Sequence, residues 1–316
     1  MDPDPAALTM GGESARAEQA MSGRNDVIQV AALVATRDRP DDLRRLLESL
    51  ARVQAPDALD YRIVIVDNSA NGNAEAIVAA APAPFPIAYL HEPRPGLSRA
   101  RNAGLGAIPD GYVATLDDDI IVPEDYLVQL ERAVRAHPGA GAIGGRVELF
   151  NREDYPISIR LGDAPETYQG GVNIFGFIPG CNQVIRRAAL ARVGAYDVRL
   201  GAGTPTSAAE DDDMIYRIWK QGYEAVYAPD LRIFHNHGRK ADEAGALQRN
   251  YIKGNGAFLT KHMMRLDPHA AAMFVKLVPW CFKAILFRAE NADYARKYLK
   301  YYAIGAARFL TSFFRR

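Results

Sequence analysis

Apolar segments alternate with helical patterns through the first half of the chain. Residues 27–35, VIQVAALVA, are apolar at nearly every position, as expected of a strand buried on both faces of a parallel sheet. In the helical pattern that follows, leucines recur at i, i+3, i+4 and i+7, at Leu43, Leu46, Leu47 and Leu50. Further strands are predicted at 61–66, 87–90 and 112–116. This alternation predicts an α/β fold with a mostly parallel central sheet.

Acidic residues stand at the ends of three of these four strands. Asp38 follows the first strand, Asp67 follows the second, and the run 117–119 is Asp-Asp-Asp after the fourth. Parallel α/β sheets bind ligands outside the carboxyl ends of their strands. Since charged side chains avoid buried strand ends unless something pairs them, the clustering predicts a ligand site at that edge of the sheet.

The second half of the chain is less regular and shows no fixed-period repeat. Helices are predicted over 187–193 and from Glu210 onwards. Strands are predicted at 142–150, 172–185, 223–227 and 231–234.

Composition narrows the range of partners and compartments. Lys plus Arg and Asp plus Glu number 38 each, so the chain lacks the basic excess of a genome-binding protein, and no nucleic-acid partner is expected. The two cysteines, Cys181 and Cys281, lie far apart and have no metal-ligand spacing. We interpret them as core thiols in a reducing cytoplasm.

Residues 1–25 lack the basic and apolar regions of a signal peptide and are predicted to be a disordered leader. The longest uncharged run, 167–185, is as long as a membrane span. Its glycines, proline and amide side chains would be poorly satisfied in lipid, so no segment is expected to cross a bilayer.

The aspartates at 117–119 predict a metal site. An Asp-x-Asp sequence after an apolar strand brings two carboxylates, those of Asp117 and Asp119, close enough to hold one hard cation such as Mn²⁺ or Mg²⁺. A turn or helix N-cap rich in aspartate would have the same sequence. His235 or His237, after a later predicted strand, is a candidate to complete the site, although such a pair is more often structural.

A second acidic run, Glu-Asp-Asp-Asp at 210–213, opens a predicted helix. Acidic side chains favour helix N-termini, but four in succession repel one another, so some must be paired or face a ligand. One of them is a candidate general base for an incoming hydroxyl group. In a third motif, 94–104, Arg99 and Arg101 lie on a helix with Ser98 as its expected N-cap, where they would contact a base or phosphate or balance the aspartates.

In this order and on these elements, the motifs resemble the family 2 glycosyltransferases, whose fold is of the GT-A type. The resemblance covers roughly 27–239. Its segments are VATRDRP at 34–40, IVDNS at 65–69, RPGLSRARNAG at 94–104, LDDD at 116–119, IPGCNQVIRR at 178–187, VGAYD at 193–197 and EDDDM at 210–214. The family pattern Glu-Asp-x-Asp has an acidic residue at x in this chain, which leaves Asp212 as an alternative to Asp211 for the catalytic base.

The resemblance implies an inverting enzyme that moves a sugar from a nucleoside diphosphate sugar, by default a UDP-sugar, to a hydroxyl of a glycan or lipid-linked saccharide, with a β-linkage as the product. It also implies roles for individual residues. The nucleoside pocket would be lined by Thr36, Asp38 and Asp67, and the base or diphosphate would be contacted by Arg101 and Arg99. Asp117 would reach the ribose or the metal, and Asp119 would bind the metal directly. The donor sugar and acceptor would be bordered by Gly180, Cys181, Asn182 and Glu210, and Asp211 would be the catalytic base.

Two other classes of function share parts of this pattern. A sugar-nucleotide pyrophosphorylase would have similar metal aspartates, but the segment 36–40 lacks the glycine-rich phosphate loop expected there. A non-catalytic saccharide-binding relative would have no need of carboxylates at both the metal and base positions.

The C-terminal part of the chain has its own character. Residues 276–316 hold nine basic and two acidic residues. Tyr294, Tyr298 and Tyr301 recur at i, i+4 and i+7, which predicts an amphipathic helix with a basic rim. This face would contact the inner leaflet of the plasma membrane, or pack on the catalytic domain or on a second subunit of a homodimer. We therefore divide the chain into a leader (1–25), a GT-A catalytic domain (26–240) and a helical extension (241–316).

Overall fold

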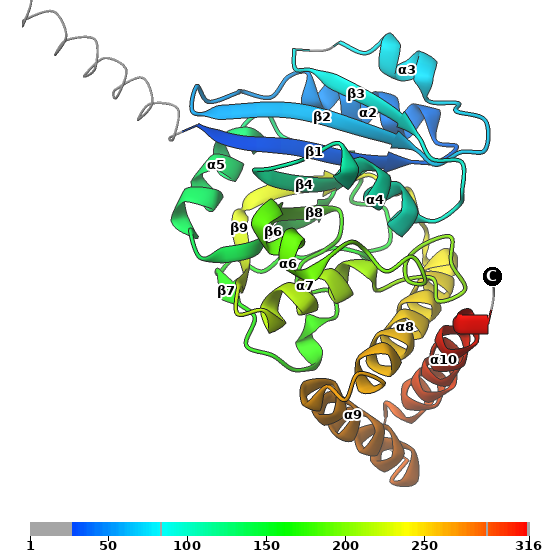
Figure 1. Cartoon of the computed structure of the whole chain (residues 1–316). Coiled ribbons are helices and arrows are strands. Elements are labelled where there is room, and N and C mark those ends of the chain that lie inside the picture. Colours follow the sequence, from blue (N-terminus) through cyan, green and yellow to red (C-terminus); the bar gives the residue numbers. More distant parts are fainter. Residues whose placement is uncertain (1–26, 83, 289, 315–316) are drawn as a thin grey trace, which may run out of the picture.

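The computed structural model describes residues 27–82, 84–288 and 290–314, so the predicted leader lies outside the described residues. The centre of the molecule is a nine-stranded sheet. Eight strands have the order β3-β2-β1-β4-β8-β6-β9-β5, and the ninth, β7, pairs with β9. Helices cover both faces of the sheet, and three long helices follow it (Figure 1). The predicted α/β class, the mostly parallel sheet and the C-terminal helices are confirmed.

The first half of the sheet is parallel, as its apolar runs predict. β1 (Ile28–Thr36) pairs with β2 (Leu59–Asp67) on one side and β4 (Tyr112–Asp117) on the other, and β2 pairs with β3 (Ile87–His91). The register sets Thr36 beside Asp67, and Ala35 beside Asp117. The carboxyl ends of these strands therefore meet at one edge, where the sequence places its acidic residues.

The second half of the sheet departs from the predicted strands in two places. Of the predicted strand at 172–185, only the end forms β8 (Asn182–Arg186), because glycines and Pro179 give a loop and the short 3₁₀ turn η2 (Val172–Ile174) instead. The two strands predicted at 223–227 and 231–234 are one strand, β9 (Glu224–His235). Its register against β6 (Ala140–Leu149) shifts where Pro229 stands, since proline cannot donate to the ladder.

The remaining pairings are antiparallel. β8 lies between β4 and β6, and the two-residue strands β5 (Ile120–Ile121) and β7 (Glu166–Thr167) both pair with β9. β5 directly follows the Asp-Asp-Asp run, so its pairing with β9 sets Ile120 opposite His235. This turn of the chain brings the predicted metal residues of two distant segments together.

Alternate residues of the buried strands feed two apolar cores, one on each face. On one face α2 (Pro40–Leu50) and α5 (Tyr126–Ala136) pack on Val30, Ala32 and Val34 of β1. On the other face α4 (Leu97–Gly106), α6 (Arg187–Val193) and α7 (Glu210–Lys220) pack with Ala31 and Leu33. The short α3 (Glu75–Ala79) lies beyond β3. The N-cap of α4 is Gly96, with φ 135°, not the predicted Ser98, whose hydroxyl donates instead to the Leu200 carbonyl at 2.8 Å.

The chain ends in α8 (Ala241–Met263), α9 (Pro268–Leu286) and α10 (Ala292–Thr311). α8 and α10 pack closely because glycine stands at both contact points. A Cβ on Gly256 would lie 2.2 Å from the Tyr302 carbonyl oxygen, and one on Gly305 would lie 1.9 Å from that of Lys253. These helices therefore cannot keep their separation if either glycine gains a side chain.

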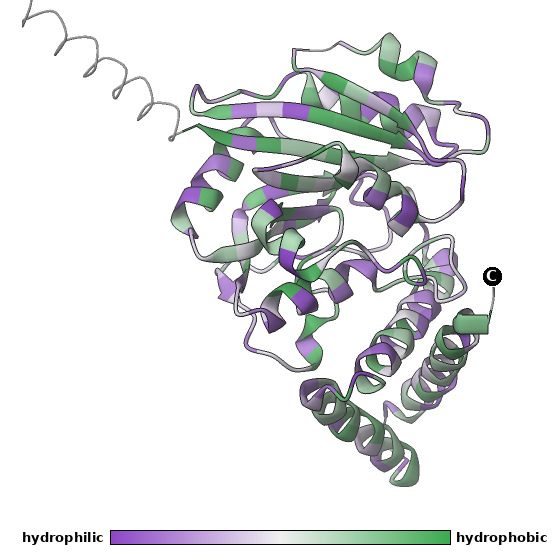
Figure 2. Ribbon diagram, in the orientation of Figure 1, coloured by the Kyte–Doolittle hydropathy of each residue, from purple (hydrophilic) through white to green (hydrophobic). Residues whose placement is uncertain are grey.

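α9 lies at the end of the molecule away from β3 (Figure 1), and most of it is hydrophobic (Figure 2). Among the described helices it is the one that is long and apolar enough to cross a membrane by length and composition, although no such segment is expected from the sequence. The predicted aromatic face of α10 is only partly exposed, because Tyr298 is buried while Tyr294 is 41% exposed. Of the three C-terminal helices, α9 exposes the most large apolar side chains, among them Val275, Phe282 and Leu286.

Candidate active site

A cavity of about 860 Å³ opens at the carboxyl ends of β1 and β4. Its size falls in the range of pockets that bind small ligands. Both acidic runs line it, as do segments from α4, from the loop before β8 and from the C-terminal helices. The predicted site residues that line it are Thr36, Arg101, Asp117, Asp119, Gly180, Cys181, Glu210, Asp211, Asp212 and His235.

The first acidic run is held by partners from three other segments. Asp118 accepts from the Thr36 hydroxyl at 2.7 Å and from Arg39 Nη1 at 3.0 Å. Asp119 accepts from the same Arg39 nitrogen at 2.9 Å and lies 3.1 Å from His235 Nε2. Burial raises the pKa of Asp118 to about 6, in spite of Arg39. Burial also acts to raise the pKa of Asp119, but His235 and Arg39 outweigh it and lower that pKa below its ordinary value.

The donor set suits a divalent cation. Ligand atoms of Asp117, Asp119 and His235 lie within 4.8 Å of one another. Two carboxylates and one imidazole are ligands that Mn²⁺ accepts, and the carboxylates also suit Mg²⁺. His237 is not part of this group, because its Nδ1 accepts from the Arg239 amide at 3.0 Å and lies 3.9 Å from Asp154. Of the two predicted histidines, His235 is the one that lies with the aspartates.

Arg101 joins the two acidic runs. Its guanidinium is 2% exposed and donates to Glu210 at 3.0 Å, to Asp117 at 3.2 Å and to the Gly180 carbonyl at 3.3 Å. Burial raises the pKa of Glu210 to about 7, helped by the neighbouring Asp211 and opposed by Arg101. With both terminal nitrogens of its guanidinium group so engaged, Arg101 fixes the spacing between β4 and the start of α7.

The four carboxylates of the second run have different surroundings. Glu210 pairs with Arg101, Asp212 accepts from the Gly176 amide at 3.0 Å, and Asp213 is fully buried among cations. Asp211 accepts from the Asp212 amide at 2.9 Å through Oδ1, while its Oδ2 has no hydrogen-bond partner among the described residues. A Cβ at Gly180 would come within 2.5 Å of that oxygen, so glycine is what leaves room for it.

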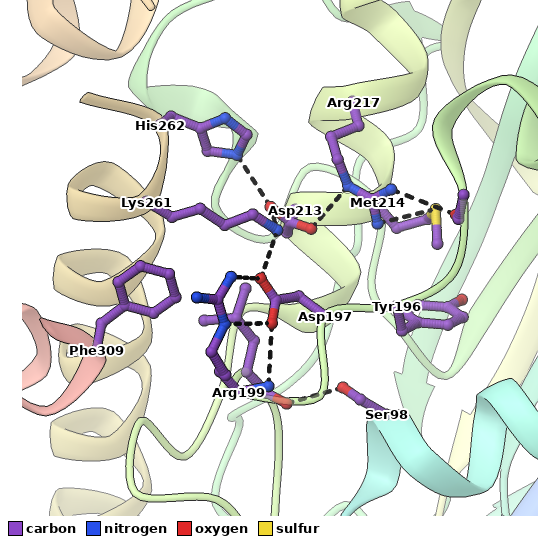
Figure 3. A network of polar contacts seen from close by, with 12 residues as sticks. Ser98, Tyr196, Asp197, Arg199, Asp213, Met214, Arg217, Lys261, His262 and Phe309 are labelled. Carbon is purple, nitrogen blue, oxygen red and sulfur yellow. Dashed lines mark hydrogen bonds and ion pairs between the residues drawn. The ribbon is translucent and has the colours of Figure 1, made fainter. Parts of the chain in front are cut away.

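A buried ion network fixes the helix that carries this run (Figure 3). Asp213 contacts Lys261 Nζ at 2.7 Å, His262 Nε2 at 2.9 Å and Arg217 Nε at 2.8 Å. Lys261 also lies 3.0 Å from Asp197, which accepts from both nitrogen arms of Arg199. Lys261 and His262 belong to α8, so the start of α7 is anchored to the C-terminal helices.

Besides His237, four predicted site residues are not among those that line the cavity. Asp67 is buried, and its carboxylate accepts from the amides of Ser69 and Ala74 at 2.8 and 2.7 Å and from Tyr89 at 3.2 Å. Asp38 accepts from the Asn73 amide group at 2.9 Å, Asn182 donates to the carbonyls of Arg146 and Leu231, and the Arg99 side chain lies next to Gly96. In this structure Asp67 holds a loop, and Asn182 ties β8 to β6 and β9.

Other residues line the cavity without having been predicted. Arg39 belongs to the TRDRP segment, directly after Asp38, and nothing in the sequence indicates that its side chain faces the site. Tyr251, Asn255, Tyr294 and Tyr298 come from α8 and α10. The helical spacing of the tyrosines is visible in the sequence, but it does not reveal which surface they face.

Known proteins resemble this chain in sequence and in fold. The sequence profile described as Glycosyl transferase family 2 matches residues 32–194. ExoM, a succinoglycan biosynthesis protein of Rhizobium meliloti, is 31% identical over 215 residues, which cover 66% of this chain and 67% of ExoM. The pre-mycofactocin glycosyltransferase of Mycobacterium tuberculosis is 26% identical over 219 residues, which cover 66% of this chain and 43% of that protein.

Solved structures with the same fold are more distant in sequence. The mannosyltransferase PcManGT from Pyrobaculum calidifontis, in complex with GDP-Man and Mn²⁺, has a TM-score of 0.57 and 16% identity, covering 96% of this chain and 97% of that one. TarS 1–349 from S. aureus, in complex with UDP-GlcNAc, has a TM-score of 0.56 and 16% identity, covering 73% and 66%. These likenesses confirm the predicted GT-A-type fold.

Proposed function

Because the chain belongs to glycosyl transferase family 2, we propose that it is an inverting glycosyltransferase that takes a sugar from a nucleoside diphosphate sugar and forms a β-linkage. The observation that carries the proposal is the position of Asp211. Its carboxylate lies in the same cavity as the Asp117, Asp119 and His235 group and keeps one oxygen free of hydrogen bonds from the described residues.

The donor would lie along the first acidic run. Solved structures of this fold hold UDP-GlcNAc in TarS and GDP-Man with Mn²⁺ in PcManGT, and both ligands are nucleoside diphosphate sugars. Arg37 and Arg39 line this part of the cavity and would offer cations to the diphosphate. We favour a UDP-sugar as the donor.

Asp117, Asp119 and His235 would hold a divalent cation, whose charge would offset the negative charge of the diphosphate leaving group. Arg39 now donates to Asp119, so it would exchange that carboxylate for another anionic partner when the cation is bound. Arg39 would then be free to contact the diphosphate, as its place in the cavity wall allows.

Asp211 would act as the general base. The acceptor hydroxyl gives its proton to Asp211 Oδ2 while its oxygen bonds to the anomeric carbon, and the bond from that carbon to the diphosphate breaks on the opposite face. This single displacement converts an α-linked donor into a β-linked product. Asp212 is less suited to the role because it accepts from the Gly176 amide and burial raises its pKa well above the ordinary value.

The test is slow donor hydrolysis without any acceptor. The full-length chain is incubated with Mn²⁺ and a panel of UDP-, GDP- and TDP-sugars, and both nucleoside diphosphate and pyrophosphate are measured. We expect the nucleoside diphosphate to be released from at least one donor, in a reaction that stops with excess chelator. Release of pyrophosphate instead, or full turnover in chelator, would contradict the proposed reaction.

For the acceptor we propose a hydroxyl of a glycan or lipid-linked saccharide. ExoM takes part in succinoglycan biosynthesis, so polysaccharide assembly is the process that this relative suggests. The enzyme would have to meet a lipid-linked acceptor at a membrane surface, and α9 offers a way for the enzyme to bind that surface.

We propose that α9 lies in the interface of an anionic membrane. One face of α9 packs through Ala270, Met273, Cys281 and Ala284. Its outer face exposes apolar side chains between the exposed lysines Lys276 and Lys283. An apolar face mixed with basic residues suits an interfacial helix better than a spanning one.

Liposome co-sedimentation at low salt tests this placement. Val275, Phe282 and Leu286 are replaced together by Gln, and the matched control replaces Phe150 and Leu161, which are exposed elsewhere on the molecule. We expect the wild-type and control proteins to bind phosphatidylserine liposomes and the α9 variant to lose most of that binding. Equal binding by the α9 variant would show that the helix has another role.

A further inference from the structure

The C-terminal helices supply one wall of the cavity, opposite the strand ends. Tyr251 and Asn255 come from α8, and Tyr294 and Tyr298 come from α10. We call these four residues the tyrosine wall. All of them lie outside residues 32–194, to which the family profile applies, and none has a role in the reaction described above.

The tyrosine wall has a defined geometry. The rings of Tyr294 and Tyr298 are 6.0 Å apart at an angle of 51°, and Tyr298 in turn stacks on Tyr302 at 6.5 Å and 21°. Asn255 Nδ2 donates to the Tyr298 hydroxyl at 3.1 Å, and the Tyr251 hydroxyl lies 2.5 Å from that of Ser158. Tyr298 is therefore fixed on two sides, whereas Tyr294, at 41% exposed, keeps much of its ring uncovered.

The tyrosine wall and Asp211 line the same cavity, so a molecule resting on the wall would share that cavity with this carboxylate. Burial and, more weakly, the charge of Asp211 raise the pKa of Tyr251 to about 12. Tyr251 thus lies within electrostatic reach of Asp211. This is where a reaction at Asp211 needs its second substrate, because the donor would occupy the side lined by Arg39 and Asp117.

The chemistry of the tyrosine wall indicates what it would bind. Its residues are uncharged, and they combine apolar ring faces with hydroxyl and amide groups. A pyranose ring has the matching surface, since its C–H groups form an apolar face and its hydroxyls form a polar rim. The four residues themselves offer no cation to a phosphate or carboxylate, and the arginines Arg160 and Arg239 line the cavity from other segments.

We propose that the tyrosine wall is the acceptor subsite and that it binds a neutral sugar ring of a saccharide acceptor, stacked on Tyr294. The proposal rests on the glycosyl transfer proposed above and adds the place and chemical class of the second substrate. The proposal also explains why the tyrosines of α10 have two different kinds of surroundings. Tyr294 and Tyr298 face the cavity, while Tyr301 lies near Arg249, Lys253 and Lys300.

Saturation-transfer NMR on the full-length chain with Mg²⁺, which is diamagnetic, and UDP tests the subsite. The probes are the methyl β-glycosides of glucose, galactose, mannose and N-acetylglucosamine, with glycerol as a non-sugar polyol. We expect at least one glycoside to bind, and we expect Tyr294→Ala to weaken it roughly 10-fold because a stacking partner is lost. Tyr294→Phe keeps the ring and should bind within about twofold of the wild type.

The matched control is Tyr155→Ala, since Tyr155 is 42% exposed and lies outside the cavity wall. This variant should bind the glycoside like the wild type. The proposal is overturned if no glycoside binds the wild-type protein, or if Tyr294→Ala binds as tightly as the control. Donor hydrolysis by the wild type reports separately on the reaction: binding that depends on Tyr294 without any hydrolysis would leave the saccharide site standing and contradict the transfer.

Discussion

The two acidic runs have nearly the same sequence but different surroundings. In the run 117–119 the charged partners, Arg39, Arg101 and His235, all line the cavity. In the run 210–213 the carboxylates point in several directions, because successive residues of a helix are turned by about 100°. Asp211 faces the cavity, whereas Asp213 points away from it into a network with α8.

The difference shows that a row of carboxylates can combine two functions. In the first run an entering cation or nucleotide would exchange partners with groups that already lie in the cavity. In the second run one residue is left free because its neighbours are held by other parts of the protein. Asp213, with Lys261 and His262, fixes the helix, and Asp211 is presented by it.

The largest effect is expected from separating the two adjacent candidates for the base. Asp211→Asn keeps the shape and removes the proton acceptor, so turnover should fall by roughly 10²–10⁴ or more. Asp212→Asn should retain most of the activity, because the Asp212 carboxylate is already bonded to the Gly176 amide. Steady-state kinetics with the best donor measures both. The reverse pattern would assign the base to Asp212.

The next effect is on folding rather than turnover. Asp213→Asn removes the anion that Arg217, Lys261 and the His262 imidazole surround, and breaking such a buried network costs about 3–5 kcal/mol. The control is Asp163→Asn, whose side chain is 89% exposed and whose pairing with Arg146 should contribute no more than about 1 kcal/mol. Urea unfolding measures the free energy of unfolding of both variants. Equal stabilities would mean that the network does not hold α7 in place.

A smaller effect is expected at the metal group. Asp119→Asn should weaken Mn²⁺ binding roughly 10- to 100-fold, as the loss of residues at metal sites commonly does. Asp110→Asn, an exposed aspartate just before β4, should leave Mn²⁺ affinity unchanged. Isothermal titration calorimetry with Mn²⁺ compares them. Unaltered binding by the Asp119 variant would remove the first run from the metal site.

Sequence patterns predict the fold well where one rule decides the outcome. The apolar run in β1 and the leucine spacing in α2 each have one structural solution, and parallel pairing then places Asp117 beside the end of β1. The predicted strand at 172–185 is wrong before Asn182, because the apolar residues there suit a strand but the glycines among them favour turns. Pairing with β6, not local sequence, joins the segments around Pro229 into one strand.

The site is less predictable because partners from distant segments decide it. His235 and His237 look equivalent in sequence, yet β9 ends at His235, and only that residue is set opposite the turn after Asp119. Lys261 and His262 lie in a helix with no sign of a link to the acidic run. The spacing of Tyr294 and Tyr298 predicts a shared face but not that this face lines the cavity.

The smallest expected effect is the pH dependence of stability, for which Asp118 in the cavity and Asp197 in the ion network have opposite signs. Burial raises the pKa of Asp118 to about 6, above the ordinary value of about 3.9. Its ionisation therefore costs stability as the pH rises, and stability should increase as the pH falls from 7 towards 4. In the network, burial opposes but Arg199 and Lys261 dominate, and they lower the pKa of Asp197 to about 2. Its contribution is complete above about pH 4 and is lost as the pH falls through 2.

Urea unfolding between pH 7 and pH 3 tests both signs. The wild-type protein should be most stable near pH 4 to 5, with a smaller rise from pH 7 in Asp118→Asn, where Glu210 and Asp212 still contribute. Below pH 4 the Asp197→Asn variant should lose less stability than the wild type, by about 1 kcal/mol at pH 3, because a group that cannot be protonated has no linkage to lose. If stability falls steadily from pH 7 downwards in all three proteins, the cavity carboxylates are not held at raised pKa values. If Asp197→Asn keeps the wild-type acid limb, Asp197 is not held by Arg199 and Lys261.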